Sequence, residues 1–105
     1  MGNPSRQKGD RFERELVKLF THHGMDAKRT PMSGAIQGWE GDVIVTINGC
    51  KERIEAKHRA KGFGQIYKWL GDNHILAIRR DFSEPLLVMR ADDLAQLLAA
   101  RDDAV

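Results

Sequence analysis

The chain has 105 residues, of which 41% are hydrophobic and 30% are charged, and its formal net charge is +2. These values are typical of an ordinary soluble globular protein, so we expect residues 1–105 to form a single domain. Cys50 is the only cysteine, which excludes an intrachain disulfide and a cysteine-rich zinc site.

The charges are unevenly distributed along the chain. Lys and Arg outnumber Asp and Glu in residues 1–30 and again in residues 51–61, whereas the last fifteen residues hold four Asp and one Arg. A basic front and an acidic tail indicate a polyanionic partner rather than a membrane. No apolar run is long enough to span a bilayer, and the N-terminus lacks an apolar signal core. We therefore expect a cytoplasmic protein.

The first predicted element is an amphipathic helix. Residues 1–9 are polar and are expected to form a flexible basic arm, and the helix should begin at Ser5 or Asp10 and end at His23. Glu13 lies at the edge of the apolar stripe, where a carboxylate needs either water or a partner. The stripe follows helical spacing and consists of Phe12, Leu16, Leu19, Phe20 and His23.

A β-hairpin is predicted around Asn48-Gly49, because both residues tolerate the positive φ that a two-residue turn requires. With Ile47 facing Cys50, the register places Asp42 directly opposite Glu55. Facing carboxylates repel and destabilise a sheet unless a positive group lies between them. Lys57 follows on the same face as Glu55, so two acids and a lysine predict a metal site.

The other segments predict three strands, two helices and one long loop. The edge strand at Met25–Thr30 is followed by a glycine-rich loop, Pro31–Gly41, that leads into Asp42. The whole order is helix, three strands, helix, two strands, helix, so we expect an α/β fold with a mixed central sheet flanked by helices. The later elements are a helix at Phe63–Leu70, strands at His74–Arg79 and Leu86–Met89, and a helix that starts at Asp92 or Asp93.

The pattern of Glu13 on a first helix, Gly41-Asp42 at a strand start and Glu55-Ala56-Lys57 on the partner strand resembles the PD-(D/E)xK nuclease superfamily. Within it, the chain is similar to the archaeal and phage Holliday-junction resolvases from Gly9 to about Leu98. Glu40-Gly41 stands where the motif has a proline. The resemblance implies a restriction-endonuclease-like core and a phage, archaeal or bacterial origin.

The resemblance also implies a role for each motif residue. Mg²⁺, with Mn²⁺ as a possible substitute, would be held by Asp42, Glu55 and the backbone carbonyl of Ala56, with Glu13 contributing through a water. Lys57 would orient the attacking water and the scissile phosphate, or act as base. The expected catalytic residues are Glu13, Asp42, Glu55 and Lys57, and the expected DNA contacts are Arg14, Arg29, Ser33 and Gln65.

The expected activity is metal-dependent cutting of four-way DNA junctions by two symmetric nicks. One chain holds one site, so this activity implies a C2 homodimer, whose interface we expect around Leu87, Met89 and Leu94. Three alternatives remain open. The chain could be another branched-DNA or nicking nuclease with the same site, it could be a catalytically silent DNA-binding module, or Asp42 and Glu55 could belong to an ordinary charged sheet face.

Overall fold

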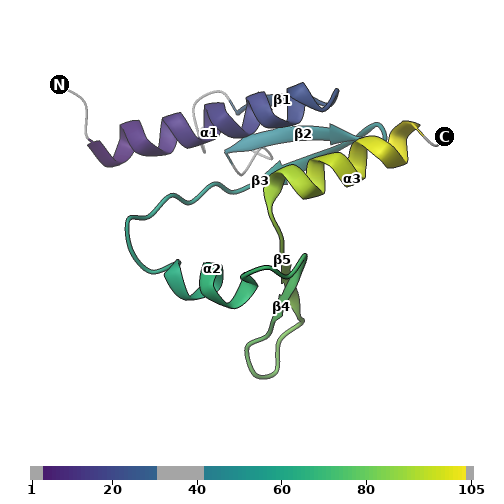
Figure 1. The fold of residues 1–105 in the computed structure, drawn as a ribbon. Helices are drawn as coiled ribbons and strands as arrows, with labels where there is room; N and C mark the ends of the chain where they lie inside the picture. The colour runs from purple at the N-terminus through teal and green to yellow at the C-terminus, as the bar shows by residue number, and fades with distance from the viewer. Residues whose placement is uncertain (1–3, 31–41, 104–105) are drawn as a thin grey trace.

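The structure is a computed structural model, and it describes residues 4–30 and 42–103. The order of elements is the predicted one (Figure 1). No helix within the described residues is long and apolar enough to cross a membrane. The elements are α1 (Pro4–His22), β1 (Asp26–Arg29), β2 (Val43–Ile47), β3 (Cys50–Ile54), α2 (Gly64–Leu70), β4 (Leu76–Ile78), β5 (Leu86–Val88) and α3 (Ala91–Asp103).

Helix α1 begins at Pro4, within the segment 1–9 that we expected to be a flexible arm. Residues 4–9 are helical, so the start near Ser5 is the better of the two predicted starts, and the expected arm is wrong for these residues. Proline is well tolerated in the first turn of a helix, where its missing N–H costs no hydrogen bond. At the other end, Gly24 adopts φ +88°, the left-handed conformation with which glycine ends helices.

Strands β1, β2 and β3 form an antiparallel sheet with β2 in the centre. Ile47 pairs with Cys50 and Val43 pairs with Ile54, which confirms the predicted hairpin register. The turn residues Asn48 and Gly49 have φ values of +51° and +81°. Both φ values are positive, as in the tight two-residue turn that an Asn-Gly pair favours. The twist of this turn matches the twist of the flanking strands.

The core lies on one face of this sheet, under α1 and α3. Val45 packs there with Phe20 from α1 and Ala95 from α3, and all three are buried. Ile44 points to the opposite face of the sheet and is also buried. Its neighbours across the two adjoining strands are Lys28 and Arg53. The aliphatic stems of such side chains can cover an apolar residue on a central strand.

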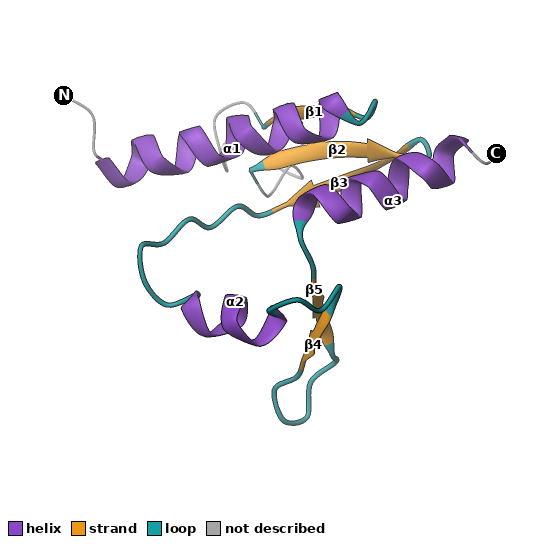
Figure 2. Cartoon of the chain, in the orientation of Figure 1, coloured by secondary structure: helices purple, strands orange, loops and turns teal. Residues whose placement is uncertain are grey.

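Helix α2 and strands β4 and β5 form a second unit, whereas α3 packs on the first sheet. Strands β4 and β5 pair only with each other, and they pair antiparallel, so the described strands make two separate sheets rather than the single mixed sheet that we expected (Figure 2). A parallel pairing between β3 and β4 would require α2 to cross over the sheet. Helix α2 instead lies beside the β4–β5 hairpin, away from the three-stranded sheet (Figure 1).

Candidate active site

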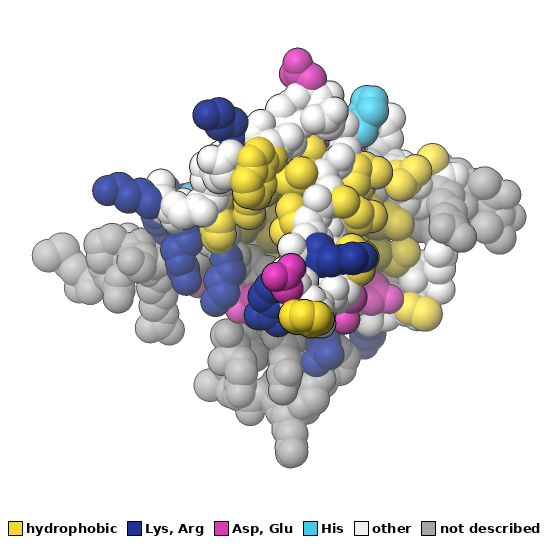
Figure 3. All heavy atoms as spheres, turned by 90° about the horizontal axis from the view of Figure 1, so that it is seen from below, with side chains coloured by type: hydrophobic (Ala, Val, Ile, Leu, Met, Phe, Trp, Pro, Cys, Tyr) yellow, Lys and Arg dark blue, Asp and Glu magenta, His cyan; other side chains and the backbone are white. Residues whose placement is uncertain are grey.

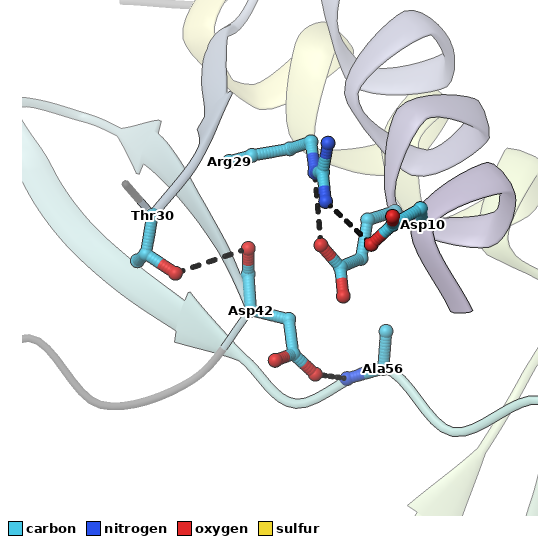
Figure 4. Close-up of polar contacts among 6 residues, drawn as sticks. Asp10, Arg29, Thr30, Asp42 and Ala56 are labelled. Atoms are coloured by element: carbon cyan, nitrogen blue, oxygen red, sulfur yellow. Dashed lines mark hydrogen bonds and ion pairs between the residues drawn. The ribbon is translucent and has the colours of Figure 1, made fainter. Parts of the chain in front are cut away.

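Asp42 lies at the point where β2 begins and β3 ends. Its N–H donates to the carbonyl of Ile54 over 2.8 Å, and its carbonyl accepts from the N–H of Thr30 over 3.1 Å. Its carboxylate oxygen Oδ2 accepts from the N–H of Ala56 over 2.9 Å (Figure 4). Backbone hydrogen bonds from two neighbouring segments therefore fix both the main chain and the side chain of Asp42.

Glu55 and Lys57 follow directly after β3. If the register is continued by one residue, Asp42 comes level with Glu55. The ammonium Nζ of Lys57 lies 3.2 Å from Oε1 of Glu55, and both side chains are more than half exposed. An exposed ion pair of this kind contributes at most about 1 kcal/mol to stability. The structure thus brings the residues of the predicted motif strand next to Asp42.

Glu13 is held by an arginine from another element. Its Oε1 accepts from Nε of Arg29, on β1, over 2.9 Å, and the Glu13 side chain is 15% exposed. The Nη2 of the same guanidinium donates to Oδ1 of Asp10 over 2.8 Å (Figure 4). The hydrogen bond that Arg29 donates to Glu13 and the charges of both acids raise the pKa of Arg29, against the opposing effect of burial. Arg29 therefore stays charged and joins the two acids of α1.

Asp10 is the residue of this cluster that the sequence analysis overlooked, since it was considered only as a possible start of the helix. Asp10 and Glu13 are three residues apart on α1, which places their side chains on the same face of the helix. Two like charges at that spacing repel weakly, and a cation beside them relieves the repulsion. This spacing was the available signal, but the strand that supplies the cation could not be read from it.

The donor atoms near Asp42 suit a hard divalent cation. The hydrogen bond from Ala56 to Asp42 places a carboxylate oxygen beside the backbone of the Glu55-Ala56 segment. Carboxylate and carbonyl oxygens are the ligands that Mg²⁺ prefers. Within the described residues, no three His, Cys, Asp or Glu side chains are gathered closely enough to hold a metal ion. The oxygens of Asp42 and of the adjoining Glu55-Ala56 segment are the candidate donors, whereas the Glu13 carboxylate is paired with Arg29.

The expected DNA contacts are spread over several elements. Arg14 is exposed on α1, and Gln65 is exposed on α2, which belongs to the second unit and lies away from Asp42 (Figure 1). Arg29 is engaged by Asp10 and Glu13. Ser33 lies outside the described residues. The structure thus places Arg29 near the candidate site and does not bring Gln65 to it.

A small cleft of about 220 Å³ opens beside the candidate site. His58, the residue after Lys57, packs edge-on against the ring of Phe12, with 5.5 Å between the ring centroids. This contact attaches the segment after β3 to α1. The cleft is lined by Lys8, Arg11, Phe12, Glu15 and His58. This basic cleft could not be predicted from the sequence, because His58 lies far along the chain from the four residues of α1.

Comparison with protein families identifies the chain. Residues 4–78 match the family described as archaeal Holliday junction resolvase (Hjc), so the match covers well over half of the sequence. The chain belongs to the archaeal Holliday-junction resolvase family. This family is a member of the PD-(D/E)xK nuclease superfamily, so the predicted resemblance is confirmed. Searches of curated proteins and of solved structures gave no match.

Membership in the resolvase family defines the broad activity. The chain is a nuclease of the junction-resolving type, its family binds branched DNA, and the family's processes are DNA recombination and repair. The matched range contains Glu13, Asp42, Glu55 and Lys57. It ends at β4, so β5 and α3 lie beyond it, whereas we expected similarity to about Leu98.

Proposed function

We propose that this chain resolves four-way DNA junctions by metal-dependent hydrolysis, with Asp42, Glu55 and Lys57 at the reaction centre. The observation that carries the proposal is the hydrogen bond from Ala56 N–H to Asp42 Oδ2, which joins the two strands that bear the acids. The family match supports the substrate class.

Asp42, Glu55 and the carbonyl of Ala56 would hold the ion, Mg²⁺ or as a substitute Mn²⁺. The chemistry that this ion supplies is neutralisation of phosphate charge and a lowered pKa for a bound water. Neutralisation matters because an anionic phosphodiester repels an anionic nucleophile. Asp42 is suited to a ligand role because two neighbouring segments already fix its main chain and carboxylate.

Lys57 has a separate role in this proposal. Its ammonium group is half exposed and is paired with Glu55 by a contact that is weak in water. The ammonium can therefore leave Glu55 to bind a DNA phosphate and orient the attacking water. Glu13 would act on the ion through a water, from a position set by Arg29. Arg14, Ser33 and Gln65 are the remaining proposed DNA contacts.

We further propose that the working form is a homodimer that makes paired, symmetric nicks. One chain supplies one set of Asp42, Glu55 and Lys57, and two nicks at a two-fold symmetric junction need two such sets. Apolar surface is available for an interface, since Figure 3 shows hydrophobic side chains gathered on the face seen from below. The exposed large apolar residues include Tyr67, Trp69, Ile75, Leu86, Leu87 and Leu97.

The test uses a labelled four-way junction with Mg²⁺ and compares wild type with Asp42→Asn and Lys57→Ala. We expect Asp42→Asn to reduce cutting to background, because the ion loses a charged ligand. Lys57→Ala should lower the cutting rate by about 100-fold or more, the usual contribution of a positioned proton-transfer or orienting group. Glu52→Gln is the matched control, because Glu52 is an exposed acid on β3 of the same hairpin.

Three outcomes would contradict different parts of the proposal. If Asp42→Asn and Lys57→Ala cut as fast as wild type, the reaction centre lies elsewhere. If linear duplex and flap DNA are cut as fast as the junction, the chain is a nuclease without junction preference. If the wild-type protein binds junctions in a salt-dependent manner but never cuts them, the chain is a silent DNA-binding module.

A further inference from the structure

The guanidinium of Arg29 bridges two carboxylates of α1 through two different nitrogens. Nε donates to Glu13 over 2.9 Å and Nη2 donates to Asp10 over 2.8 Å (Figure 4). Arg29 itself comes from β1, the strand that pairs with β2 next to Asp42. The contact therefore connects the helix that bears Glu13 to the sheet that bears Asp42.

Two hydrogen bonds fix the orientation of the Arg29 guanidinium, which one hydrogen bond cannot do. A guanidinium is planar, so a single hydrogen bond through Nε leaves it free to rotate about that bond, whereas a second bond through Nη2 fixes its plane. Asp10 provides that second bond, and its side chain is 38% exposed, so it can be replaced without opening a hole in the core. Glu13, in contrast, is mostly shielded from water and depends on Arg29 for its counter-charge.

We propose that Asp10 is a positioning residue that acts through Arg29. Asp10 fixes the guanidinium, and the guanidinium fixes the carboxylate of Glu13 at the edge of the reaction centre. This inference rests on the role of Glu13 in the proposed function. It also adds a role for Arg29, since Nε and Nη2 already donate to Glu13 and Asp10, and only the remaining N–H groups are left for a DNA phosphate. Arg29 therefore acts first as a link between α1 and β1.

The first experiment replaces Asp10 and measures single-turnover cutting of a four-way junction with Mg²⁺. Asp10→Asn should cut about 10-fold to 100-fold more slowly, the usual effect of losing a residue that orients a metal partner. Asp10→Glu, which keeps the charge, should recover most of the rate. The matched control is Asp26→Asn, which removes an exposed carboxylate from the same strand as Arg29. It should cut like wild type.

A second measurement separates positioning from DNA binding and from folding. Junction affinity in the presence of a chelator should be the same for Asp10→Asn and wild type, because Asp10 does not touch DNA. In nitrogen-15 spectra of the metal-free protein, the Nε–H of Arg29 should exchange slowly with solvent in wild type and lose that protection in Asp10→Asn. A thermal melt of each variant shows that the fold is retained.

A double-mutant cycle tests whether Asp10 acts through Arg29. Arg29→Lys keeps the positive charge but removes the planar guanidinium. In that background, Asp10→Asn should therefore slow cutting by less than about a further 2-fold. An equal loss of cutting rate in the wild-type and Arg29→Lys backgrounds would overturn the inference. So would an Asp10→Asn protein that cuts at the wild-type rate although the Nε–H of its Arg29 exchanges rapidly. Failure of the proposed function is distinct, because Asp42→Asn would then cut normally whatever Asp10 does.

Discussion

At the scale of single residues, the candidate site combines one rigid acid with one loosely held pair. Asp42 is fixed by hydrogen bonds to Ile54, Thr30 and Ala56. Glu55 and Lys57 are exposed and hold each other only through a solvated contact. A site built in this way can keep a ligand atom in place while a charged group nearby changes its partner.

Glu55→Gln should separate activity from stability. Both members of the Glu55–Lys57 pair are more than half exposed, so the free energy of unfolding should change by less than about 1 kcal/mol. Junction cutting should nevertheless fall to background, since the amide cannot supply the ligand charge. Urea denaturation and the cutting assay measure the two effects. A loss of stability as large as that of a core substitution would show that Glu55 is a structural residue.

At the scale of elements, local signals were sufficient for prediction. The Asn48-Gly49 turn, the register of β2 and β3, and the end of α1 within one residue of His23 follow from conformational preferences of neighbouring residues, and all were predicted. Interactions between distant elements were harder to predict. The burial of Ile44 depends on side chains of two flanking strands, and the partner of Asp10 comes from β1.

The architecture of the later strands shows the same limit. The apolar run at residues 74–79 predicted a strand over that whole range, but β4 spans only Leu76–Ile78, and Ala77 is exposed. A run of apolar residues indicates either burial in the core or an interface, and the sequence does not distinguish the two. Whether β4 joins the first sheet depends on where α2 lies, and no residue of β4 encodes that placement.

The hairpin turn gives a second prediction, on stability. Gly49→Ala should lower the free energy of unfolding by about 1–2 kcal/mol, because a residue with a Cβ is strained at a φ of +81°. The control is Gly9→Ala, inside α1, where an added Cβ meets no atom within 4 Å. That change should stabilise the protein by about 0.5–1 kcal/mol. Denaturant titration of both variants is the measurement, and equal destabilisation would contradict the turn geometry.

At the scale of the whole molecule, the segment between β5 and α3 is attached to the end of α2 by polar contacts. The side chain of Arg90, just before α3, donates to the carbonyls of Gly71 and Asn73 at the end of α2. A cleft of about 430 Å³, lined mainly by apolar side chains, separates α1 from α2. The exposed apolar residues of α2, β5 and α3, such as Trp69, Leu87 and Leu97, are the natural candidates for the proposed interface.

Leu87→Glu tests the proposed homodimer. Leu87 is 69% exposed on β5, so a charge there is compatible with the fold of one chain but not with burial against a second chain. Light scattering should report a dimer for wild type and a monomer for the variant. The monomer should make single, unpaired nicks in the junction. A wild type that is monomeric at working concentration and still makes paired nicks would overturn the dimer.

Cys50 has a practical consequence for such measurements. It is the only cysteine, it is exposed, and it begins β3 directly after the turn, at the end of the hairpin opposite Asp42. Glu55 lies five residues further along, about 17 Å at the usual strand rise. One thiol-reactive spin label per chain would therefore sit close enough to report on the reaction centre and far enough to leave it undisturbed. In a two-fold assembly on a junction, the single distance between two such labels would follow the spacing of the two cutting sites.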